Sequence, residues 1–238
     1  MSRPQFVYLH VGNDASFPTL LVRSIRASNK DAVIYQCSDT KSPAAAGIDH
    51  IFRLPGDASK LIAFRAQAYA ELNLTDPAIY MDTDMLVVSR LDVSGLVKDH
   101  DVALCLREFG RNTVINTAFR GMNLSEYTGK TFGEVYPYLG CAAVTRNNQF
   151  WIDCLNNFNS LPDKFHFWYG DQEALRNVAN SNRYRVAGLP ESKFACLPDE
   201  TVPNIKDVSI FHFKGVTRKH FMIEYAKRLD LIAPHELR

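Results

Sequence analysis

AIYMDTDMLVV, residues 78–88, is the stretch that decides the fold, because two carboxylates interrupt an apolar run here. Thr75-Asp76-Pro77 ends the preceding helical pattern, so residues 78–81 are predicted to form a short buried strand. Asp82 and Asp84 then lie at the carboxyl end of that strand. Open α/β sheets bind their ligands at this end of their strands.

The two aspartates are spaced i, i+2, and side chains at this spacing in an extended segment point in the same direction. Asp82 and Asp84 can therefore contact one hard cation, and oxygen ligands favour Mg²⁺ or Mn²⁺. The other coordination positions of the cation could take the two phosphates of a nucleotide diphosphate. The alternative is a polar strand end with two solvated aspartates, and the apolar residues on both sides favour the metal site.

Composition limits the function classes that this chain can belong to. The 238 residues are 46% hydrophobic, which is typical of a folded globular protein. The 27 Lys and Arg residues nearly balance the 26 Asp and Glu residues, and no long run of one sign occurs. Nucleic acid is therefore not an expected partner, because a nucleic-acid-binding protein normally has a basic patch or stripe.

The five cysteines are odd in number and scattered through mostly apolar sequence, which favours reduced buried thiols over a disulfide framework or a zinc cluster. They are Cys37, Cys105, Cys141, Cys154 and Cys196. A cytosolic location is expected, and no segment is long enough for a signal peptide or a membrane span. An amphipathic helix is predicted over 221–232; packing onto the domain is favoured over peripheral membrane contact, because the helix has few basic residues.

Strands and helices are predicted to alternate in the first half of the chain. The strands are 6–11, 32–36, 51–54, 78–81 and 101–106, and the helices are 18–27 and 59–74. The first strand, helix and strand form a βαβ unit, and a nucleotide could lie at the turn Gly12-Asn13-Asp14. No glycine-rich dinucleotide or phosphate-loop motif is present, so a cation held by the aspartates would bind phosphate. On the second helix, spacing alone favours a surface role for Arg65 over a phosphate-facing one.

The second half holds two further informative stretches after a looser excursion over 107–138, which we interpret as lying near the site. FHFWYGDQEAL, residues 165–175, leads aromatic residues into a helix that opens with Asp171 and Gln172. Asp171 could cap this helix, or it could bind sugar hydroxyls while the rings cover the apolar face of a pyranose. These two interpretations are equally supported by the residues.

VSIFHFKGVTRK, residues 208–219, is the other stretch, and a strand in it delivers His212 inward. A glycine that permits close backbone approach and several cations follow it, which suits a diphosphate. These cations are Lys214, Arg218 and Lys219, and the glycine is Gly215. The role of third metal ligand is therefore favoured for His212 over the role of a satisfied core histidine.

In these motifs and in their order the chain resembles the retaining nucleotide-sugar glycosyltransferases of the GT-A fold, family 8, which include glycogenin and bacterial lipopolysaccharide galactosyl- and glucosyltransferases. YMDTD (80–84) looks like the metal motif of that family, Asp171-Gln172 like its Asp-Gln pair, and HFKG (212–215) with Arg218 like its last motif. The resemblance implies an α/β fold with a central, mostly parallel sheet flanked by helices. It also implies a single domain over 1–238, with a nucleotide-binding half (about 1–106) and an acceptor and donor-sugar half (about 107–238).

The resemblance further implies transfer of a hexose from a nucleotide diphosphate sugar, by default UDP-glucose or UDP-galactose, to a glycan or lipid-linked acceptor with retention. Mn²⁺ or Mg²⁺ would be bound by Asp82, Asp84 and His212, and the catalytic pair would be Asp171 and Gln172. The nucleotide-sugar contacts would be His10, Val11, Gly12, Asn13, Asp14, Arg65, Thr83, Gly140, Lys214, Gly215 and Arg218. Surface-glycan synthesis at the inner face of a membrane is the expected setting.

Two departures from the family pattern bear on sugar and acceptor specificity. Lys219 follows Arg218 where the family usually has Pro-Trp, and YLGC (138–141) lacks the usual Asn. One competing hypothesis is a haloacid-dehalogenase-like phosphatase with Asp82 as nucleophile, but Leu86 stands where that family has Thr or Val. Another is an inactive sugar-binding module, against which the intact metal motif argues.

Overall fold

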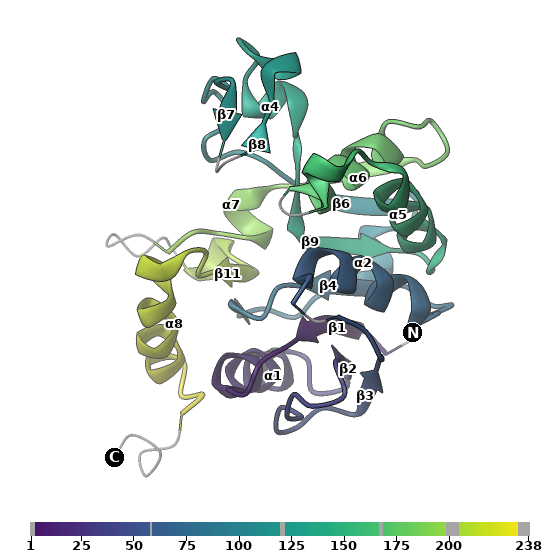
Figure 1. The fold of residues 1–238 in the computed structure, drawn as a ribbon. Coiled ribbons are helices and arrows are strands. Elements are labelled where there is room, and N and C mark those ends of the chain that lie inside the picture. Colours follow the sequence, from purple (N-terminus) through teal and green to yellow (C-terminus); the bar gives the residue numbers. More distant parts are fainter. Residues whose placement is uncertain (1–2, 58, 120–121, 167–168, 199–204, 233–238) are drawn as a thin grey trace.

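A seven-stranded sheet in the order β10-β6-β9-β4-β1-β2-β3 forms the centre of the structure (Figure 1). This computed structural model describes all residues except 1–2, 58, 120–121, 167–168, 199–204 and 233–238. The strands of the sheet are β1 (Gln5–His10), β2 (Val33–Ser38), β3 (His50–Arg53), β4 (Ala78–Met81), β6 (Val102–Leu106), β9 (Tyr138–Thr145) and β10 (Val186–Leu189). Only β9 runs antiparallel to its neighbours, which confirms the predicted mostly parallel α/β sheet.

Successive residues of a strand point to opposite sides of the sheet, so side chains project from both of its faces. Helices cover both faces. The helices are α1 (Ser16–Ser28), α2 (Leu61–Glu71), α3 (Val93–Leu96), α4 (Phe132–Val135), α5 (Gln149–Ser160), α6 (Gly170–Ala179), α7 (Glu191–Phe194) and α8 (Val216–Arg228). Phe6 and Tyr8 of β1 pack with α1, α3 and α7, whereas Val7 packs with α2, α5 and α6. The result is a three-layer sandwich with an apolar core on each side of the sheet.

Two smaller strand pairs lie outside the central sheet. β5 (Met85–Val87) pairs antiparallel with β11 (Ile210–His212), and β7 (Ala118–Phe119) pairs with β8 (Met122–Asn123). The second pair and α4 lie together at the top of Figure 1, well away from α1. Three short 3₁₀ turns complete the described elements: η1 (Ser125–Tyr127), η2 (Asp163–Phe165) and η3 (Ile205–Asp207).

Two helix predictions were wrong in detail. The helix predicted over 59–74 spans only Leu61–Glu71 as α2, and Leu61 at its start is 52% exposed beside the cavity described below. The last helix begins at Val216 rather than 221, because Gly215 adopts a left-handed φ of 86° that ends the extended chain. The shift places Arg218 and Lys219 in the first turns of α8, and Phe221 is 39% exposed.

The cysteine prediction was confirmed, since all five thiols are free and buried. No described helix combines the length and the apolar character that crossing a membrane requires.

Candidate metal and ligand site

A cavity of about 660 Å³ opens at the carboxyl edge of the central sheet. Its wall includes His10 at the end of β1, Asp82 just after β4 and Arg107 just after β6. These strands run in the same direction, so their carboxyl ends meet at one edge, where α/β sheets bind ligands. The predicted site residues that line the cavity are His10, Val11, Arg65, Asp82, Thr83, Asp84, Gly140, Asp171, Gln172, His212 and Lys214.

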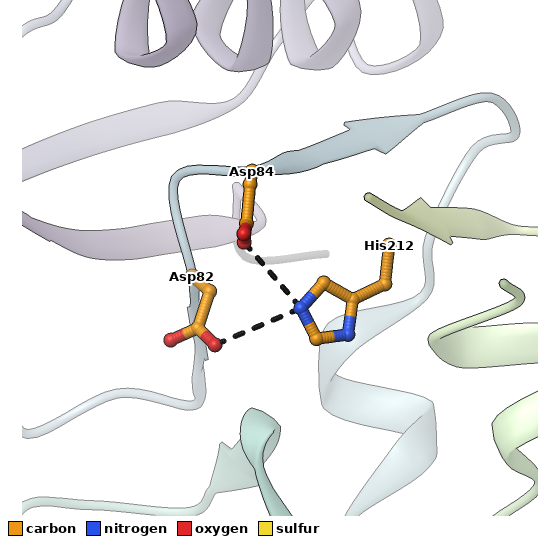
Figure 2. Close-up of side chains that lie close together, drawn as sticks. All are labelled: Asp82, Asp84 and His212. Atoms are coloured by element: carbon orange, nitrogen blue, oxygen red, sulfur yellow. Dashed lines mark ion pairs between the residues drawn. The ribbon is translucent and has the colours of Figure 1, made fainter. Parts of the chain in front are cut away.

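Asp82, Asp84 and His212 form a cluster in which one ligand atom from each lies within 4.8 Å of the others. Figure 2 shows both carboxylates facing the same imidazole nitrogen, with His212 Nε2 at 3.4 Å from Asp84 Oδ1 and 3.9 Å from Asp82 Oδ2. The antiparallel pairing of β5 with β11 places His212 opposite Met85 and so beside Asp84. The strand pair therefore brings together two motifs that are far apart in the sequence.

The electrostatics of the cluster suit a cation. Burial raises the pKa of Asp82, despite the opposing charges of Arg65 and His212. Burial also acts to raise the pKa of Asp84, but the hydrogen bond and charge of His212, with help from Lys219, lower it. Burial acts to lower the pKa of His212, yet its contacts with Cys141 and Asp84 raise it to about 10. Two carboxylates and one imidazole are a donor set that fits Mn²⁺ or a similar divalent ion, which would replace the imidazole proton.

Arg65 lies inside the cavity and bridges two carboxylates. Its Nη1 donates to Asp82 Oδ1 at 2.8 Å, and its Nη2 forms an ion pair with Asp171. The side chain is 23% exposed, so the interpretation of a surface arginine was wrong. Arg65 ties the metal cluster to the start of α6 and offsets negative charge that would otherwise repel.

The start of α6 is set by a glycine that tolerates no side chain. A Cβ at Gly170 would collide with the carbonyl oxygen of Phe165 and lie 2.7 Å from the ring of Phe158. Tyr169 precedes it with a left-handed φ of 63°, an unusual conformation for a non-glycine residue. Asp171 follows in the first turn, where its Oδ1 accepts a hydrogen bond from the Gln172 N–H at 2.8 Å, so the carboxylate helps to satisfy the start of the helix. The same carboxylate also lines the cavity.

Gln172 is held against β9 by hydrogen bonds that use both ends of its amide. With the amide oriented to satisfy both groups, Nε2 donates to the Tyr138 carbonyl oxygen at 2.9 Å and Oε1 accepts from the Gly140 N–H at 2.8 Å. A Cβ at Gly140 would lie 2.7 Å from the end of the Gln172 amide, so a side chain at this position would displace Gln172. The glycine of the predicted YLGC motif therefore serves the packing of α6 onto the sheet.

Several predicted site residues lie outside the cavity lining: Gly12, Asn13, Asp14, Gly215 and Arg218. The first three are exposed in the turn after β1. Asp14 Oδ1 accepts hydrogen bonds from the N–H and hydroxyl of Ser16, which lower the pKa of Asp14 and tie it to the start of α1. His10 at the end of β1 and Val11 just after it do line the cavity, and burial lowers the pKa of His10.

The cavity also has lining residues that the sequence did not single out, among them Arg107, Thr113 and Phe132, and it is lined as well by Tyr169 of the predicted aromatic stretch. Arg107 directly follows a predicted strand, and that position was the only local signal for it. The others come from the excursion 107–138 and from the aromatic stretch before α6. Of that stretch, Phe167 and Trp168 lie outside the described residues.

No model of a known protein family matches the sequence, and a search of curated proteins found no match. Solved structures do match. The galactosyltransferase LgtC, in complex with donor and acceptor sugar analogs, has a TM-score of 0.59 at 13% identity over 97% of this chain and 98% of its own.

The bifunctional glycosyltransferase WbbM has a TM-score of 0.64 at 16% identity over 99% of this chain. The glycosyltransferase GlyE from Streptococcus pneumoniae TIGR4 has a TM-score of 0.61 at 13% identity over 95% of this chain. The chain spans 51% of WbbM and 60% of GlyE. Because these identities are low, the matches establish the fold alone: the chain has the GT-A glycosyltransferase fold and resembles LgtC, WbbM and GlyE in structure.

Proposed function

We propose that this protein is a metal-dependent glycosyltransferase that moves a hexose from UDP-glucose or UDP-galactose to a hydroxyl group of a glycan or lipid-linked acceptor, with retention. The observation that carries the proposal is the cluster of Asp82, Asp84 and His212 in a cavity at the carboxyl edge of a GT-A sheet. It is supported by the fold shared with LgtC, whose structure contains donor and acceptor sugar analogs.

Asp82, Asp84 and His212 would hold Mn²⁺ or Mg²⁺. When bound, this cation supplies positive charge that stabilises the departing diphosphate. Lys214 lines the same cavity, and Lys219 Nζ lies 3.9 Å from Asp84 Oδ2, so both lysines are near the place where phosphate charge would develop. Their role is to bind the diphosphate as point charges.

The remaining nucleotide contacts follow from position. We assign Gly215 and Arg218, which follow Lys214 at the start of α8, to the diphosphate as well. Thr83, which lies between the two aspartates in the sequence, is assigned to the nucleotide sugar. The uracil and ribose are assigned to residues 10–14 after β1. In this arrangement residues 1–106 form the nucleotide-binding half of a single domain, and residues 107–238 form the donor-sugar and acceptor half.

Asp171 and Gln172 are assigned to the donor sugar and the reacting centre. Arg65 would position Asp171 relative to the metal cluster, because its guanidinium contacts Asp82 and Asp171 at once. Asp171 keeps lone pairs that can accept from sugar hydroxyls. The hydrogen bonds of Gln172 to β9 fix its side chain beside Gly140, at the wall that the sugar would contact.

A cytosolic setting is part of the proposal and is supported by the five buried free thiols, which suit a reducing compartment. Contact with the inner face of a membrane would be peripheral. It would involve α8, on which Phe221 and Ile223 are 39% and 41% exposed.

The test is release of UDP from UDP-glucose and UDP-galactose, measured by chromatography with Mn²⁺ and with a chelator. The proposal predicts release that needs the cation and is lost in Asp84→Asn. The control is Glu224→Gln, which removes an exposed charge on α8 and should keep the wild-type rate. Metal-independent release, or full activity of Asp84→Asn, would contradict the proposal. The anomer formed first, followed by NMR, tests retention.

A further inference from the structure

Arg107 is a cation in the cavity wall that the donor site does not use. It follows β6, is partly buried, and lines the cavity together with Phe132 and Tyr169. In the part of the chain that the structure describes, Arg107 has no carboxylate partner; its hydrogen bonds go to a carbonyl oxygen and a hydroxyl. The other arginine in the cavity, Arg65, is by contrast paired with two aspartates.

The Arg107 side chain is held in a fixed orientation. Its Nε donates to the Tyr136 carbonyl oxygen at 2.8 Å, and its Nη2 donates to the Tyr169 hydroxyl at 3.3 Å. Its Cζ lies 5.5 Å from the centre of the Phe132 ring. Nη1 makes no hydrogen bond to any described residue, so it is available to a ligand in the cavity.

Two acidic residues at this strand end, Glu108 and Glu191, bind backbone groups instead. Glu108 Oε2 accepts from the Ser192 N–H at 2.7 Å. Glu191 Oε2 accepts from the N–H groups of Glu108 and Phe109 at 2.7 and 2.8 Å. The charge of Arg107 is thus left for whatever occupies this part of the cavity.

The position of Arg107 points to the acceptor and not to the donor. In the sheet, β9 separates β6 from β4, whose end carries the metal cluster. The neighbours of Arg107 in the wall are Phe132, which is 6% exposed, and Tyr169, whose partly exposed ring suits the apolar face of a sugar ring. A pyranose that stacks there can bring a charged substituent to the guanidinium.

We propose that the acceptor is a sugar with an anionic group, a carboxylate or a phosphate, and that Arg107 binds this group. The inference rests on the proposed function and names the substrate class of the acceptor side. Arginine suits the task because its planar fork can bind either group through two hydrogen bonds. No bond is formed or broken at Arg107, which acts as a specificity-determining residue.

The experiment is calorimetric titration of the full chain loaded with UDP and Mn²⁺. The probes are methyl β-glucuronide, which carries a carboxylate, and glucose 6-phosphate; methyl β-glucoside and glucose are their neutral parents. At least one anionic probe should bind about tenfold or more tightly than its parent, as expected for charge-assisted hydrogen bonds. The probe with the larger ratio identifies carboxylate or phosphate as the preferred group.

Variants separate the role of Arg107 from general charge. Arg107→Gln should remove the preference, and Arg107→Lys should keep part of it, which also shows that the fold tolerates a change here. Arg111→Gln, a change at an exposed residue outside the cavity lining, should leave the preference intact. Equal or tighter binding of both neutral sugars, no binding of either anionic probe, or a preference that survives in Arg107→Gln would overturn the inference. Failure of UDP and Mn²⁺ to bind in the loading step would instead overturn the proposed function.

Discussion

Glu173 is a buried carboxylate that fastens the excursion 107–138 to α6, and its replacement by glutamine tests how the cavity wall is held. The side chain is 5% exposed. The hydroxyls of Tyr127 and Tyr136 donate to it at 3.1 and 2.9 Å, and Arg176 forms an ion pair with it. Burial and the charge of Glu173 raise the pKa of Tyr127 to about 12 and raise that of Tyr136 further, so both tyrosines stay protonated donors at neutral pH.

Glu173→Gln keeps the shape of the side chain and removes its charge. A hydrogen bond to a charged group contributes about 1.5–3 kcal/mol and a neutral one about 1 kcal/mol, so each tyrosine contact should lose about 1 kcal/mol. Arg176 also loses its partner, at a cost below the 3–5 kcal/mol typical of fully buried pairs, because Arg176 is 23% exposed. The free energy of unfolding should therefore fall by about 2–4 kcal/mol.

Urea denaturation followed by circular dichroism measures this loss, and hydrogen exchange should show reduced protection in residues 107–138. Glu126→Gln is the matched control, because Glu126 pairs with Lys164 near the same segment but is 40% exposed. The control should lose less than about 1 kcal/mol. A loss in Glu173→Gln no larger than that of the control would refute the idea that this network holds the wall.

Three further results are expected. Gly170→Ala should lower the free energy of unfolding in urea by about 2 kcal/mol or more, because the new Cβ collides with Phe165; an unchanged midpoint would count against this packing. Asp84→Asn should abolish metal-dependent turnover with little change in the circular dichroism spectrum; wild-type rates in this variant would exclude Asp84 as a metal ligand. Because the pKa of His212 is raised to about 10, Mn²⁺ must displace a proton at neutral pH. Calorimetry should then show affinity rising by up to about tenfold per pH unit between about pH 6 and 8, and a pH-independent affinity would contradict it.

The metal motif was readable from the sequence because its signals are local. The strand predicted at 78–81 has the same bounds in the structure, and its apolar residues are all buried. The strand that carries His212 was found for the same reason. Side-chain periodicity and turn residues report such elements without knowledge of the rest of the chain.

The tertiary contacts of the site residues could not be predicted from such local signals. Arg65 and Asp171 are separated by 106 positions, and only the packing of α2 and α6 on one face of the sheet brings them together. Tertiary contact, not helix periodicity, therefore decided that Arg65 faces the cavity. Arg107 was missed for the same reason, since no local pattern distinguishes a cavity residue from a surface one.

The most direct test of the account is a thermal-shift scan of the wild-type protein with UDP-sugars and GDP-mannose, each with and without Mn²⁺. A ligand that binds only the folded state raises its apparent stability. The account predicts a rise in melting temperature that needs both Mn²⁺ and one UDP-hexose, because Asp82, Asp84 and His212 complete the donor site only with a cation. No shift with any nucleotide sugar, together with metal-dependent hydrolysis of a simple phosphate ester, would contradict it and favour a phosphatase.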